Sequence, residues 1–168
     1  MDLGAMVDEA GIIIRGHIVQ TRYEKHPELT NLDTLVITVR VAETLKGSVG
    51  ETYTFRQFIW DIRDRNDHAG YKKGQEVLFL LLAANENALS SPSGLDQGKF
   101  RIERNARGEA MATNGWGNRE LFKNVPAQLK TKGAQISARA MQVATRQTRG
   151  PVPLDELREI IRGLAGSK

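Results

Sequence analysis

Stretches in which aliphatic residues occupy every second position, with no helical pattern between them, constrain the fold of this chain more than any other feature. The clearest stretch runs from Asp33 to Leu45, where Leu35, Ile37 and Val39 share one face of an extended chain. Such alternation is typical of a strand with one face buried. Five further strand candidates lie at residues 11–23, 51–60, 76–82, 99–103 and 109–113. We therefore predict a mainly β protein, with an antiparallel, OB-like barrel of five or six strands over residues 11–113.

Two of these strands carry features that bear on the shape of the sheet. Gly16 interrupts the aliphatic run at residues 11–23, and a glycine within a strand favours a bulge or a bend. Residues 76–82 are almost continuously apolar, which is typical of a strand that is buried on both faces or that closes a barrel. Together the two features favour a sheet that curls.

Helical spacing is clearest at the two ends of the chain. Apolar residues predict a short N-terminal helix over residues 2–10, which Asp2 would cap. An apolar stripe, with acidic residues near its start, predicts an amphipathic helix over residues 154–164.

The segment between the strands and the last helix lacks both patterns. The chain thus divides into an OB-like barrel domain at 1–118, a basic irregular linker at 119–150 and a C-terminal amphipathic helix within 151–168. We expect residues 1–118 to stay folded, with lower stability, when the rest of the chain is removed.

The charge is unevenly distributed along the sequence. The net charge is +4, but residues 1–118 contain 14 Lys and Arg against 16 Asp and Glu, whereas residues 119–150 contain 7 against 1. A surface that follows a phosphate backbone needs its cations on a rigid framework. Because the basic excess falls in the segment predicted to be irregular, the charge pattern argues against a nucleic-acid partner.

Four short motifs occur in an order that resembles known β-domains. They are EAGIIIRGHIV at 9–19, AETLKG at 42–47, KKGQEVLFLLL at 72–82 and QGKFRI at 97–102. Their order resembles a group of uncharacterised bacterial β-barrel domains that are often exported. More distantly it is similar to the netrin-like module of the tissue inhibitors of metalloproteinases, which implies a five-stranded OB barrel.

The resemblance implies a location more readily than an activity. The inhibitors chelate the zinc of a protease through an N-terminal cysteine, and this chain contains no cysteine and no disulfide. Export to the periplasm or the extracellular space is implied by the bacterial domains. No signal-peptide pattern follows Met1, so a cytoplasmic location is the alternative. No apolar run approaches the ~18 residues that a membrane span needs.

The sequence contains no recognisable catalytic, metal or cofactor site. The three histidines lie far apart, and no serine stands in a GxSxG motif. Asp61, Asp64 and Asp67 are spaced unlike the ligands of a calcium loop, and Arg63 and Arg65 between them would neutralise their charge. We therefore predict no enzymatic activity and no cofactor, and a solvated, ion-paired loop at these residues.

The remaining candidates are residues that could contact a partner. They are Trp60, Arg63, Arg65, His68, Lys99 and Trp116. A large amphipathic ring at the end of a strand, such as Trp60, is typical of an interface, and the alternative is a ring that caps one end of the barrel. The leading hypothesis is a non-catalytic module that binds a protein. One alternative is an OB-type binder of single-stranded nucleic acid that stacks bases on aromatic side chains; another is a small hydrolase whose site carries no sequence signal.

Overall fold

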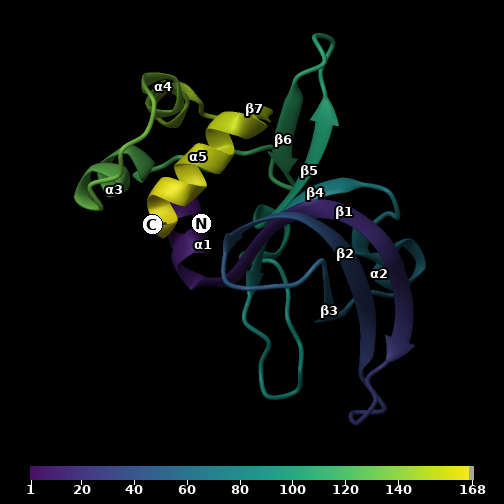
Figure 1. The fold of residues 1–168 in the computed structure, drawn as a ribbon. Coiled ribbons are helices and arrows are strands. Elements are labelled where there is room, and N and C mark those ends of the chain that lie inside the picture. Colours follow the sequence, from purple (N-terminus) through teal and green to yellow (C-terminus); the bar gives the residue numbers. More distant parts are fainter. Residues whose placement is uncertain (167–168) are drawn as a thin grey trace.

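The computed structural model describes residues 1–166, which form one antiparallel sheet in the order β3-β2-β1-β4-β5-β6-β7 and five α-helices (Figure 1). The strands are β1 (Ala10–Lys25), β2 (Asp33–Lys46), β3 (Thr52–Phe58), β4 (Glu76–Leu82), β5 (Lys99–Arg104), β6 (Ala110–Asn114) and β7 (Val152–Pro153). The helices are α1 (Leu3–Glu9), α2 (Ile62–Asp67), α3 (Val125–Thr131), α4 (Ala138–Arg146) and α5 (Leu154–Ala165), with the short 3₁₀ turns η1 (His68–Gly70) and η2 (Leu95–Gln97). The mainly β class is confirmed.

The sheet differs from the prediction in the number of its strands. The sheet has seven strands rather than five or six, because Val152 and Pro153 return from the C-terminal part of the chain and pair with Ala112 and Met111 of β6. No strand pairing among residues 1–166 joins the two edges, β3 and β7, so the sheet is not closed.

Strand β4 contributes to two hydrophobic clusters, one on each face of the sheet. Val77, Phe79 and Leu81 pack with side chains of β1, β2 and β3 inside the curl of the sheet. Leu78 and Leu80 pack against a second cluster that includes α1, α3, α4 and α5. Figure 1 shows these helices gathered at one end of the molecule and the bent strands β1 and β2 at the other end. Burial of residues 76–82 on both faces is confirmed.

One of the register irregularities of β1 lies at the predicted glycine. The register between β1 and β2 shifts between Arg15 and Gly16, which marks a β-bulge. A Cβ atom on Gly16 would collide with the backbone carbonyl oxygen of Arg40 on β2. The bulge therefore requires glycine because only a residue without a side chain allows the two backbones to approach so closely.

The prediction of an irregular linker at 119–150 was wrong, because this segment contains α3 and α4. The N-cap of helix α4 is Ser137, whose side chain accepts a hydrogen bond from Ala140 N. The segment is anchored in the second cluster by a few apolar side chains. These buried residues are Leu121, Phe122, Val125, Leu129, Ala140 and Ala144. Small alanines make up the buried face of α4, and this explains the weak apolar pattern in the sequence.

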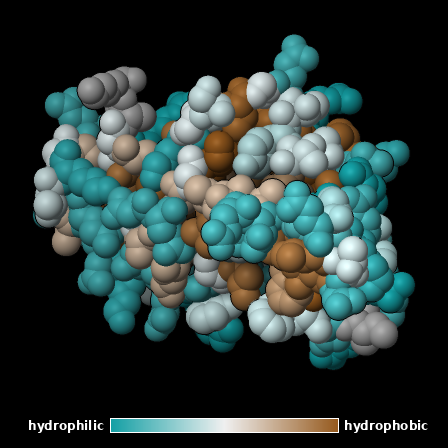
Figure 2. Space-filling view, turned by 90° about the horizontal axis from the view of Figure 1, so that it is seen from below, coloured by the Kyte–Doolittle hydropathy of each residue, from teal (hydrophilic) through white to brown (hydrophobic). Residues whose placement is uncertain are grey.

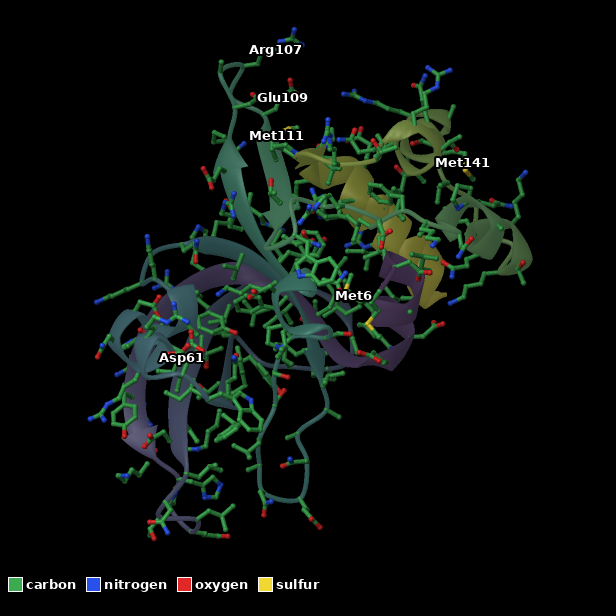
Figure 3. The ribbon with its side chains drawn as sticks, turned by 180° about the vertical axis from the view of Figure 1, so that it is seen from behind. Met6, Asp61, Arg107, Glu109, Met111 and Met141 are labelled. Carbon is green, nitrogen blue, oxygen red and sulfur yellow. The ribbon has the colours of Figure 1, made fainter. Side chains whose placement is uncertain are left out.

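The two terminal helices agree with the sequence. Helix α1 is capped by Asp2, whose side chain accepts from Ala5 N at 2.8 Å. Helix α5 buries an apolar stripe that includes Leu157, Ile160 and Ile161. Figure 3 places Met6 of α1 near the middle of the molecule and Arg107 at the tip of the projecting β5–β6 hairpin.

The segment that follows β4 bridges part of the open side of the sheet. Ser90 N donates to Arg56 O on β3 at 2.8 Å, and Leu82 N on β4 donates to Ser91 O at 2.9 Å. Residues 89–93 are therefore hydrogen-bonded both to an edge strand and to a central strand, which fixes the loop that forms one wall of the site described next.

Candidate functional site

A groove of about 660 Å³ lies where β3 ends, between the turn that contains α2 and η1 and the loop that follows β4. Its lining is mostly apolar and aromatic. The residues that line it include Phe58, Trp60, Asp64, Tyr71, Leu95, Asp96 and Lys99. The face that carries the loop after β4, seen from below in Figure 2, shows hydrophobic residues gathered in its middle.

The rim of the groove exposes two large hydrophobic side chains. Trp60 is 87% exposed and Leu95 is 61% exposed, the two highest values among the large hydrophobic residues that the structure describes. Trp60 follows β3, and its ring meets the ring of Phe58 edge-on with 4.4 Å between centroids. Leu95 follows Gly94, which adopts a left-handed backbone and turns the chain outward into η2. Leu95 is therefore held on a short turn, whereas Trp60 lies between β3 and Asp61, the N-cap of α2.

The floor of the groove is built on Tyr71. Its ring is buried and meets Phe55 and Phe79 edge-on, and its hydroxyl donates to Gln57 Oε1 at 2.5 Å. Burial raises the pKa of Tyr71, so the hydroxyl stays protonated and neutral. Tyr71 thus supplies a rigid apolar surface.

Lys99 places one ammonium group beside this floor. Its Nζ lies 3.8 Å from the centroid of the Tyr71 ring and donates to Ala69 O at 2.8 Å. Burial lowers the pKa of Lys99, and the carboxylates of Asp96, Asp67 and Asp64 oppose that shift. A cation over an aromatic face gains electrostatic attraction from the ring.

Two carboxylates in the lining outnumber this cation. Asp64 and Asp96 both line the groove. Burial raises the pKa of Asp64 above its ordinary value, and the nearby Asp61 and Asp67 raise it further. The two lining carboxylates, Asp64 and Asp96, favour a positively charged ligand group.

Two of the six predicted residues, Trp60 and Lys99, line the groove. Arg63, Arg65 and His68 belong to the adjacent turn but do not line it. Trp116 belongs to a different surface, at the turn after β6.

The three neighbouring side chains have local partners. Arg63 pairs with Asp61 at 2.8 Å, Arg65 lies 4.2 Å from the centroid of the Tyr23 ring, and His68 Nδ1 is 2.6 Å from the hydroxyl of Thr21.

The aspartates of this turn shape the backbone. Asp61 caps α2 by accepting from Arg63 N at 2.9 Å, and Asp67 accepts from Ala69 N at 3.0 Å. No group of three or more metal-ligating side chains is found among the described residues that could hold a metal ion.

The serines and the buried histidine are engaged in the fold. Ser90 Oγ donates to Leu82 O at 2.6 Å, and Ser93 Oγ donates to the carboxylate of Glu9. His26 Nδ1 accepts from the backbone N–H groups of Glu28 and Leu29 and so closes a turn. No hydrogen bond in residues 1–166 joins a serine to a histidine.

The sequence did not point to Tyr71, Leu95 or Asp96. Leu95 is one of two leucines in a stretch rich in Asn, Ser, Pro and Gly, and a large apolar residue in such a stretch is the signal that could have marked it. Tyr71 could have been noticed as the one aromatic residue of the polar stretch before β4.

Comparison of the chain with models of protein families, with curated proteins and with solved structures finds no match. Among the helices of residues 1–166, none combines the length and the apolar character that a membrane crossing requires.

Proposed function

We propose that this chain is a non-catalytic module that binds a protein partner through the groove between β3, α2 and the loop after β4. The observation that carries the proposal is that Trp60 and Leu95, the two most exposed large hydrophobic side chains of the described residues, line the same groove. An exposed apolar rim around a concave surface is typical of a binding site, and Trp is enriched among the residues that dominate binding energy.

The groove favours a partner segment of defined chemistry. Its apolar floor around Tyr71 accepts an aliphatic or aromatic side chain, and the carboxylates of Asp64 and Asp96 favour a Lys or Arg beside it. We infer that the ligand is an exposed segment of another protein in which an apolar residue is followed or preceded by a basic one.

The OB-like and netrin-like interpretation of the fold belongs to the same proposal. It is supported by the curl of β1 and β2 and by residues 89–93, which are hydrogen-bonded both to β3 and to β4. On this interpretation the sheet is a partly open barrel with its binding surface in loops at one end, as loops commonly carry recognition on a rigid scaffold.

Selection from a library of random peptides tests the proposal. The immobilised protein is expected to enrich sequences that combine an apolar residue with a neighbouring Lys or Arg. A synthetic peptide of that kind should shift the NMR signals of Ala83, Leu89 and Leu95, which line the groove. Trp60→Ala should weaken its binding by about tenfold or more, as expected for an interface hot spot.

Leu29→Ala is the matched control, because Leu29 is also exposed but does not line the groove. Binding that tolerates Trp60→Ala as well as Leu29→Ala would contradict the proposal. So would a peptide whose NMR shifts map outside the groove.

A further inference from the structure

A second surface combines the other tryptophan with cations from two distant segments. Gly150 N donates to Gly117 O at 2.8 Å, and Asn118 Nδ2 donates to Gly150 O at 2.9 Å. These bonds bring the turn after β6 against the turn after α4. The surface, called here the Trp116 patch, comprises Trp116, Arg119, Arg146 and Arg149.

The patch stands on a folded framework. The basic segment 119–150 contains α3 and α4, and its apolar side chains are buried in the second cluster. Gln147 Nε2 donates to Arg149 O at 2.7 Å and so fixes the turn that carries this arginine. The cations of this segment are therefore carried by a folded framework and not by the irregular linker that the sequence predicts.

The arginines of the patch are open to an external anion. All three are exposed, and none forms an ion pair with another of residues 1–166; the pairs made by this segment involve Lys132 and Arg139 instead. Glu120 is the only acidic residue in the whole segment 119–150. Arg119 Nε donates to Trp116 O at 3.0 Å, which holds this guanidinium beside the tryptophan.

We propose that the Trp116 patch binds single-stranded nucleic acid. Trp116 is 44% exposed, so its indole ring can stack on a base, and the exposed arginines of the two adjoining turns can contact the phosphates. A lipid surface fits less well, because an interfacial helix inserts its apolar face and the apolar face of α4, Ala140 and Ala144, is buried against the core. In Figure 2 the end of the molecule that contains α3 and α4, at the left, is mostly hydrophilic.

The direct test measures binding of a fluorescent oligothymidylate of about 20 nucleotides by anisotropy, at about 50 and 200 mM salt. The combined variant Arg119→Gln, Arg146→Gln and Arg149→Gln should lose at least tenfold in affinity at the lower salt. Its slope of log affinity against log salt should fall by about 2, as expected for three lost phosphate contacts on a single strand. The control variant Lys72→Gln, Lys73→Gln and Arg107→Gln removes the same charge from exposed positions elsewhere and should bind like the wild type.

Stacking is tested separately from charge. Trp116→Ala should weaken binding roughly tenfold and Trp116→Phe much less, because phenylalanine retains a stacking face. In a Trp60→Phe protein, Trp116 is the one remaining tryptophan, and its fluorescence should be quenched when the oligonucleotide binds. Thermal melting of each variant checks that it remains folded.

Three results would overturn the proposal. The first is equal loss of binding in the patch variant and in the control variant. The second is tight binding to heparin that Trp116→Ala leaves unchanged, which would indicate a general polyanion site. The third is binding to phosphatidylserine vesicles without binding to the oligonucleotide.

Discussion

The carboxylate of Glu43 on β2 accepts two hydrogen bonds from the guanidinium of Arg158 on α5, with 2.6 Å between Arg158 Nε and Glu43 Oε1 for the first. Arg162 donates to Glu43 Oε2 at 2.5 Å, and Arg15 on β1 donates to Oε1 at 3.3 Å. One carboxylate thus holds the C-terminal helix against two strands. The hydrogen bonds from Arg158 are the largest cause of the lowered pKa of Glu43.

Loss of this carboxylate is expected to destabilise the protein in a pH-dependent way. Glu43→Gln should lower the free energy of unfolding at neutral pH by about 2 kcal/mol, because charge-assisted hydrogen bonds are lost. A carboxyl whose pKa is lower in the folded protein contributes stability that is complete above its unfolded pKa and is lost as the pH falls through the folded pKa. The difference between wild type and variant, measured by urea unfolding, should therefore shrink below about pH 4.

Glu103→Gln is the control for this prediction, because the Glu103 side chain is exposed and its pair with Arg101 is on the surface. It should change the free energy of unfolding little at any pH. A Glu43→Gln difference that stays constant down to about pH 3 would show that the carboxylate does not act through its charge.

Replacement of Gly16 should disturb the bulge of β1. Gly16→Ala places a Cβ atom against the carbonyl oxygen of Arg40, and β1 and β2 must move apart to accommodate it. We expect a loss of about 2 kcal/mol in the free energy of unfolding, measured by urea denaturation. Gly50→Ala should be close to neutral, because a Cβ atom added to Gly50 would meet no atom within 4 Å apart from its chain neighbours. Equal effects of the two substitutions would contradict the steric explanation.

Asn118 is expected to be among the most sensitive polar positions. Its buried side chain donates to Ala112 O and Gly150 O, both at 2.9 Å, and accepts from Asn114 N at 2.9 Å. Asn118→Ala loses all three hydrogen bonds and should lower the free energy of unfolding by about 3 kcal/mol.

Asn118→Gly separates the side chain from the backbone at this position. Asn118 has φ of 61°, which glycine adopts without strain. It should therefore lose about 1 kcal/mol less than Asn118→Ala. If Asn118→Ala were better tolerated than Asn118→Gly, strain of the left-handed backbone would not contribute to the loss of stability.

Deletion of residues 119–168 should leave the rest of the chain insoluble, in contrast to the expectation from the sequence alone. Leu78, Leu80 and Phe100 are buried against the cluster to which α3, α4 and α5 contribute. Without these helices one face of β4 and β5 would expose a large apolar surface to water. Expression of residues 1–118 followed by sedimentation checks this, and a soluble fragment with a cooperative thermal transition would contradict it.

The strands were predictable because their burial is periodic. Apolar and polar residues alternate over residues 33–45 because one face of β2 packs in the cluster inside the curl of the sheet. They do not alternate over residues 76–82 because β4 is covered on both faces. Helix α4 escaped prediction because its two buried residues, Ala140 and Ala144, are small and form no stripe of large apolar side chains. Strand β7 consists of two residues and exists only through its pairing with β6.

The candidate groove was predictable only in part. Trp60 could be found because a tryptophan at the end of a strand is conspicuous in a sequence. Leu95 and Asp96 reach the groove because hydrogen bonds of residues 89–93 fix the preceding loop on β3 and β4. The bond from Ser90 to Arg56 joins positions 34 residues apart, and no local pattern encodes it.

The sharing of β4 by both hydrophobic clusters means that neither can melt while the other stays intact, so heating should give a single cooperative transition. A ligand that occupies the groove binds only the native state and should raise the melting temperature of the entire chain. A dye attached to an exposed position of α5, far from the groove, would then report its occupancy, which provides a thermal-shift screen for partners.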